Sequence, residues 1–205
     1  MSEIPYTKEL EKEYIELFST CDPSKNRIAE IQLTVKKILS NQKRYQRVSS
    51  ITSVPWYIVA AIHSMESSLN FNKHLHNGDS LSKRTTHVPK GRPTSGSPPF
   101  SWEESAIDAL RLKKLDTWKR WSLPGVLYKL EQYNGWGYRK YHPSVHSPYL
   151  WSFSNHYTKG KYIEDGSFSK NAVSEQCGAA VLLLVLSQSD SADIDIDLSI
   201  NRAEN

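Results

Sequence analysis

Glu66 is the acidic residue whose neighbours along the chain suggest chemistry. It lies near the end of an apolar segment, residues 56–67, in which Ile58, Ile62 and Glu66 recur every four residues. Helical spacing of this kind places the three side chains on one face. Apolar surroundings disfavour the charged carboxylate and raise its pKa, and a carboxylic acid that stays protonated near neutral pH can act as a general acid. The simpler alternative is a solvated glutamate at a fraying helix end.

Asp79 and the threonines that follow it supply the other parts of a glycosidase design. Asp79 comes directly after Asn77-Gly78, a strong signal for a two-residue hairpin turn. We expect Thr85 or Thr86 on the returning strand. In this design the glutamic acid protonates the glycosidic oxygen, while the aspartate and the hydroxyl hold water or stabilise positive charge on the far face of the sugar. Turn preference alone would explain the aspartate, and strand propensity alone would explain the threonines.

Two histidines of the same segment, His74 and His76, alternate as residues of a strand do, so they could face a common ligand. Together with Asp79 they look like part of a metal site. No HExxH motif or other full ligand set accompanies them. We therefore expect no metal and no organic cofactor, and we expect the two histidines to support the hairpin or to contact substrate. His63, one helical turn before Glu66, is interpreted as a core histidine rather than as a group that tunes the pKa of the glutamate.

Aromatic residues are concentrated between residues 133 and 162. The faces of Trp and Tyr rings stack on sugars, and amide side chains bond to sugar hydroxyls. We therefore expect a glycan-binding wall made of Tyr133, Asn134, Trp136, Tyr149 and Trp151. The alternative is that half or more of these large side chains simply belong to the core.

Helical periodicity must position these candidates. It predicts helices over about residues 6–18, 23–42, 56–67, 101–114, 123–133 and 170–187. Ser101 and Glu104 form a capping-box pattern at the start of one of them. Residues 43–53 are expected to be a polar connection, residues 70–99 a small β-hairpin with a proline-rich return, and residues 135–168 a long aromatic loop. The prediction is an α+β fold, mainly α-helical, with a small β-hairpin after the helix that carries Glu66.

Composition excludes several classes of protein. The chain has 205 residues, with 26 basic and 22 acidic side chains. No apolar run reaches the roughly 18–20 residues that a membrane-spanning helix requires. Cys21 and Cys177 are too far apart for metal spacing and too few for a disulfide framework. The net charge of +4 permits an anionic partner, but the basic residues are scattered and match no recognition motif, so nucleic acid is not expected.

The first residues of the chain, MSEIPYTKELEKEY, contain acidic side chains and no apolar core such as a signal peptide has. We therefore expect synthesis in the cytoplasm without a signal peptide. A monomer is expected.

A longer string of residues resembles a known family. The segment from Val54 to Leu69, followed by His74-Leu-His-Asn-Gly-Asp79, resembles the lysozyme-like superfamily, and more closely a bacterial and phage group of peptidoglycan hydrolases. The pattern of that group continues here in Arg84-Thr85, in Val88-Pro89 and in the sequence PPFSWEESA at residues 98–106. Tyr133-Asn134-Gly135 is similar to a substrate-contacting turn of lytic transglycosylases and related lysozymes. The resemblance covers about residues 54–186.

The resemblance implies a lysozyme-like fold and a glycosidase (N-acetylmuramidase) activity on the bond between N-acetylmuramic acid and N-acetylglucosamine. It makes Glu66 the general acid. Asp79 and Thr85 are six residues apart, which is the interval between the corresponding aspartate and threonine of phage-type lysozymes. The partner would be the glycan strands of peptidoglycan, reached in the cell wall after release or delivery. The expected organisation is an N-terminal helical extension, residues 1–50, packed on a catalytic domain, residues 51–187, with a disordered tail, residues 188–205.

Three other functions remain open. A lytic transglycosylase would cut the same bond with one acid, and the separation of the carboxyl groups decides between inverting, retaining and transglycosylase outcomes. A metal-dependent peptidoglycan peptidase would use the region of His74 and His76. A non-catalytic glycan-binding module would keep the fold without turnover. The sequence does not distinguish a phage endolysin from a toxin or a resident enzyme.

Overall fold

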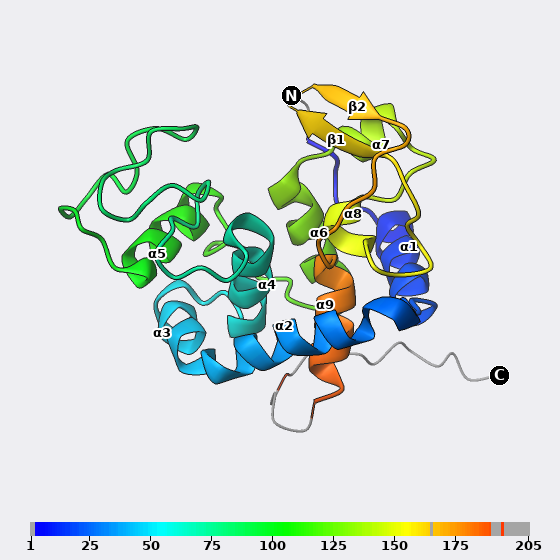
Figure 1. The fold of residues 1–205 in the computed structure, drawn as a ribbon, viewed down its shortest axis with the longest axis horizontal. Helices are drawn as coiled ribbons and strands as arrows, with labels where there is room; N and C mark the ends of the chain where they lie inside the picture. The colour runs from blue at the N-terminus through cyan, green and yellow to red at the C-terminus, as the bar shows by residue number, and fades with distance from the viewer. Residues whose placement is uncertain (1–2, 165, 190–193, 195–205) are drawn as a thin grey trace. The chain divides into compact units, whose positions relative to one another are not determined.

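The computed structural model describes residues 3–164, 166–189 and 194. This part of the chain is mainly helical and contains one two-stranded antiparallel sheet (Figure 1). It divides into two compact units. Unit 1 comprises residues 1–35 and 120–205, and unit 2 comprises residues 36–119. The expected extension, catalytic domain and tail, with boundaries at residues 50 and 187, stay a prediction, and most of the expected tail, residues 188–205, lies outside the described residues.

Unit 2 is built around α3 (Gln42–Thr52), α4 (Trp56–Ser67) and α5 (Trp102–Leu112). Helix α3 contacts both of the others. The prediction of a polar connection at residues 43–53 is wrong, because α3 occupies this stretch. Its buried side chains, Tyr45, Val48 and Thr52, recur every three or four residues between charged and polar ones. The stripe is narrow and includes a threonine, and its composition therefore hides it from a search for apolar periodicity.

Helix α4 has the limits that its sequence predicts, Trp56–Ser67. Its buried positions go all round the helix, from Trp56 to Ser64 without a break. The helix ends where Ser68 and Leu69 adopt positive φ angles of 52° and 60°. This left-handed exit turns the chain directly into the segment that carries His74, His76 and Asp79.

The hairpin predicted at residues 70–99 is not formed. The segment holds one isolated antiparallel bridge, between Lys73 and Ser80, and no strand. Prolines at positions 89, 93, 98 and 99 explain the difference, since a residue without an N–H group cannot donate to a ladder. The two-stranded hairpin of the described chain lies elsewhere, where β1 (Lys161–Glu164) pairs with β2 (Ser167–Ser169).

Unit 1 contains the remaining elements. They are α1 (Lys8–Ser19), a 3₁₀ turn at Lys25–Arg27, α6 (Leu123–Asn134), α7 (Gly137–Tyr141), α8 (Pro148–Trp151), β1, β2 and α9 (Ala179–Ser187). Helix α1 packs on α6, α6 on α8, and α8 on α9. Helix α2 (Ile28–Ser40) begins in unit 1 and ends in unit 2. Within the described part of the chain, no helix is both long enough and apolar enough to cross a membrane.

Two expectations for unit 1 need correction. The last helix begins at Ala179 and not near residue 170, because the chain before it runs against α8. A Cβ atom added at Gly178 would lie 2.3 Å from the carbonyl oxygen of Leu150, and the Gly178 N–H donates to the carbonyl of Ser152 at 2.9 Å. The aromatic stretch at residues 135–168 is not one loop, since it contains α7, α8 and β1.

Candidate functional site

Glu66 lies in the last turn of α4 and is half-buried, although most of the helix before it is fully buried. The Asn77–Asp79 turn approaches it closely. A Cβ atom added at Gly78, which has a φ of +77°, would lie 3.6 Å from the carbonyl oxygen of Glu66. The end of the helix and the turn that carries Asp79 are therefore neighbours, as the proposed chemistry requires.

The carboxylate of Asp79 is the organising centre of the segment that follows. Its Oδ2 accepts hydrogen bonds from the N–H groups of Thr86 at 2.7 Å and His87 at 3.0 Å, and longer ones from the Thr86 hydroxyl and the Asn77 amide, both at 3.3 Å. Its Oδ1 pairs with His87 Nδ1 at 2.6 Å. The bonds from His87 and Thr86 hold the pKa of Asp79 well below its usual range. The residue is thus an anion, and it is not a proton donor.

Thr85 is buried in an irregular stretch and not on a strand. Its hydroxyl donates to the carbonyl of Pro89 and accepts from the N–H of Arg92 at 2.9 Å. Its own N–H donates to the carbonyl of Arg92 at 2.8 Å. A hydroxyl has one proton to give, so Thr85 in this arrangement has none left to orient a water molecule.

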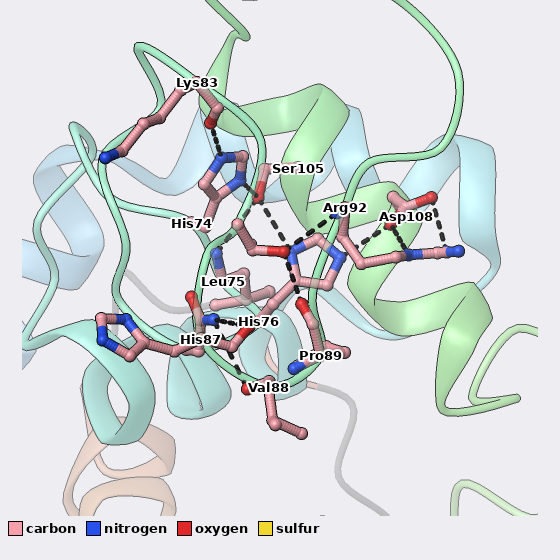
Figure 2. A network of polar contacts seen from close by, with 12 residues as sticks. His74, Leu75, His76, Lys83, His87, Val88, Pro89, Arg92, Ser105 and Asp108 are labelled. Carbon is pink, nitrogen blue, oxygen red and sulfur yellow. Dashed lines mark hydrogen bonds and ion pairs between the residues drawn. The ribbon is translucent and has the colours of Figure 1, made fainter.

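His74 and His76 belong to a buried polar network with α5, which Figure 2 shows. The hydroxyl of Ser105 lies 2.8 Å from His74 Nδ1 and 3.4 Å from His76 Nδ1, and it accepts from the N–H of Leu75 at 3.2 Å. His74 Nε2 donates to the carbonyl of Lys83 at 2.8 Å. Both imidazole rings are 0% exposed. Their geometry therefore matches the supporting role of the sequence prediction, and no substrate can reach them in this conformation.

Asp108 of α5 extends this network to Arg92, at the far end of residues 74–92. Arg92 binds it with two parallel bonds of 2.8 Å, and His76 Nε2 lies 2.7 Å from it (Figure 2). Burial lowers the pKa of His76, and the neighbouring Asp108 only partly opposes this shift. A two-bond guanidinium–carboxylate pair fixes both direction and distance. Residues 74–92 are thus attached to α5 by a network made of side chains.

His63 is a core residue, as its sequence suggests. It is 0% exposed, its Nδ1 lies 3.1 Å from the hydroxyl of Tyr45, and its ring is packed against Phe71 and Trp102 at centroid distances of 4.6 Å and 4.5 Å. Burial lowers its pKa to about 4. The ring one turn before Glu66 is therefore neutral at neutral pH.

The aromatic residues expected to form a glycan-binding wall lie in unit 1 and are largely buried. Their exposures are 8% for Tyr133, Trp136 and Tyr149, and 1% for Trp151. Only Asn134, at the end of α6, is exposed. Rings this deeply buried offer edges and not faces, so the geometry of these aromatic residues is that of a core.

Glu131 is a chemically notable residue that the sequence prediction missed. It is 3% exposed on α6, and its Oε2 accepts from the Tyr14 hydroxyl at 2.5 Å and from Arg139 Nε at 2.8 Å. Burial raises the pKa of Glu131, and the positive charge of Arg139 partly offsets this effect. The available signal was its spacing, four residues after Leu127 on the apolar face of the helix.

The described residues include no group of three or more His, Cys, Asp or Glu side chains arranged to hold a metal ion. Comparison with protein-family models, curated proteins and solved structures gives no match for this chain.

Proposed function

We propose that this chain cleaves the glycan strands of peptidoglycan at the bond between N-acetylmuramic acid and N-acetylglucosamine, with Glu66 as general acid. The observation that carries the proposal is the position of Glu66. It is half-buried at the end of a buried helix, and the Asn77–Asp79 turn lies against its backbone. The resemblance of residues 54–186 to lysozyme-like hydrolases agrees with this position. The substrate implies action in the cell wall after release or delivery.

Protonation of the glycosidic oxygen by Glu66 is the central step. As the bond between the oxygen and the anomeric carbon breaks, its electron pair goes to the leaving sugar, and positive charge develops on the remaining ring. Asp79 is ionised and contributes a negative field toward that charge. We assign Thr85 to holding the segment in shape, through its bonds to Pro89 and Arg92.

The second candidate is a lytic transglycosylase that cuts the same bond. The observation that favours it is that the one hydroxyl proton of Thr85 is committed to Pro89 and that both oxygens of Asp79 already accept bonds from the loop, so neither residue is dedicated to an attacking water. In that mechanism a hydroxyl of the sugar itself attacks the anomeric carbon, and Glu66 acts first as acid and then as base. The product carries an anhydro-sugar end in place of a reducing end.

Replacement of the acid tests the proposal directly. Glu66→Gln keeps the size of the side chain and removes its proton, so turnover of purified peptidoglycan should fall by roughly 10²–10⁴-fold. Glu175→Gln, at an exposed position of unit 1, is the matched control and should keep the wild-type rate. Mass spectrometry of the released muropeptides reports the bond that is cut and separates hydrolysis from transglycosylation. Clearance by Glu66→Gln at the wild-type rate would refute the assignment.

The same assay separates the two remaining functions. A metal-dependent peptidase would release peptides and not glycan fragments, and a chelator would stop it. A non-catalytic module would bind peptidoglycan and release nothing, in the wild type as well as in Glu66→Gln.

A further inference from the structure

Unit 1 contains a polar cavity of about 360 Å³ that is independent of Glu66. Among the residues that line it are Glu13, Glu131, Arg139, Pro143, Ser147 and Trp151. Its volume lies at the small end of the range for small-molecule sites, roughly 300–1,000 Å³. A space of this size suits one ring-sized ligand and not a polymer segment.

Glu131 presents an open hydrogen-bond acceptor at this cavity. Tyr14 and Arg139 both bind its Oε2, and no bond within the described part of the chain reaches Oε1. The side chain is nevertheless 4% exposed. A carboxyl oxygen without a donor inside the protein can accept a hydrogen bond from a ligand, so the site favours a ligand that donates one there.

Ser147 adds a second group without a partner. The residue is 2% exposed, and its hydroxyl is buried without a hydrogen-bond partner among the described residues. It stands directly before α8, yet its side chain makes no capping bond to that helix. A hydroxyl both donates and accepts, so it complements a ligand group that does the same.

Arg139 completes the set as a donor. Its Nε binds Glu131 at 2.8 Å, and its Nη1 binds both oxygens of Glu13 at 2.8 Å and 3.2 Å. A fifth of the side chain is exposed, so a ligand can reach the guanidinium. One guanidinium thus lies between two carboxylates and retains donors of its own.

This set of groups selects a neutral ligand rich in hydroxyls. A cation would meet the guanidinium of Arg139, and an anion would meet the carboxylates of Glu13 and Glu131. Hydroxyl groups can donate to Glu131 Oε1, accept from Arg139 and exchange a bond with Ser147. Pro143 and Trp151 supply apolar surface for the C–H side of a ring. We propose that the cavity binds a single pyranose sugar, as a second saccharide site separate from the one that contains Glu66.

The test is a titration of the full chain with N-acetylglucosamine, followed by NMR shifts of the Ser147 amide and the Trp151 indole. Saturable shifts are expected. Ser147→Ala should keep the wild-type melting temperature, since the lost hydroxyl has no protein partner, and should bind the sugar roughly tenfold more weakly. Ser144→Ala, at an exposed serine of the same segment, is the matched control and should bind like the wild type.

Three outcomes would overturn the proposal. They are the absence of saturable shifts in the wild type, equal affinity of Ser147→Ala and the wild type, and saturation by methylammonium without saturation by the sugar. Glu66→Gln should keep the sugar-induced shifts at Ser147. Failure of this inference and failure of the proposed catalytic role are therefore separate results.

Discussion

Asp79 shows how much one side chain can organise. Its carboxylate accepts bonds from Asn77, Thr86 and His87, and those from His87 and Thr86 hold its pKa well below the usual range. An aspartate that served only as a nucleophile would need an unengaged oxygen. The bonds instead hold the Asp79 carboxylate in one place, and the proposed function requires its charge to act on the substrate from that place.

Asp79→Asn tests this role. An amide has one oxygen in place of two and presents N–H donors toward the N–H groups of the loop, so several bonds are lost. The free energy of unfolding should fall by roughly 1–3 kcal/mol, as measured by urea denaturation, and peptidoglycan turnover should fall with it. Asp79→Asn with wild-type stability but no activity would instead indicate a direct chemical role.

At the scale of elements, the segment between α4 and α5 is held by side chains and not by a sheet. Ser105 of α5 is the common partner of His74, His76 and the Leu75 N–H. Figure 2 shows these groups converging on one hydroxyl. Residues 74–79 therefore depend on α5 for their conformation.

Ser105→Ala should loosen that segment. Removal of the hydroxyl leaves buried histidine nitrogens and one N–H without a partner, at a cost of about 2–3 kcal/mol. Hydrogen exchange at the Leu75 amide should become faster. Ser101→Ala is the control, because it removes the capping bond of α5 to Glu104 without touching the histidines. Equal acceleration at Leu75 in both variants would contradict the role given to Ser105.

Sequence reasoning located α4 and the start of α5 because their signals are local. Buried positions repeat along α4, and Ser101 and Glu104 cap α5 as predicted. It failed for residues 70–99, where Asn77-Gly78 does form a turn but the prolines prevent a ladder. The partners of Asp79 and Glu131 lie between 2 and 117 residues away along the chain, and no spacing rule connects Glu131 with Tyr14.

At the scale of the whole molecule, the described chain comprises two units with different contents. Unit 2 contains Glu66, Asp79 and the buried histidines, and unit 1 contains the Glu131 cavity. Composition showed too few cysteines for a disulfide framework, but it could not assign the aromatics. In the structure they are mostly core, so aromatic content alone was a weak guide to sugar binding.

Stability of the molecule should depend on pH through His63. Its pKa is about 4 in the folded chain against an ordinary value of 6.5, so the unfolded chain takes up the proton first as the pH falls. The contribution of neutral His63 to the free energy of unfolding is present above pH 6.5 and is lost as the pH falls toward 4. Between pH 6.5 and 4.5 the loss should be about 2 kcal/mol.

Urea denaturation at the two pH values measures this loss. His63→Gln has no proton to gain and should lose less stability over the interval. His146→Gln, at an exposed histidine, should follow the wild type. Identical losses in wild type and His63→Gln would show that other groups produce the pH dependence.

The prolines between α4 and α5 have a consequence for neighbouring molecules. A strand edge with unpaired N–H and C=O groups is a template on which a second chain can add a strand, and aggregation begins in this way. Pro89, Pro93, Pro98 and Pro99 interrupt the donors of this segment. The same residues that prevent a sheet within the fold thus protect a long irregular segment from intermolecular β-pairing.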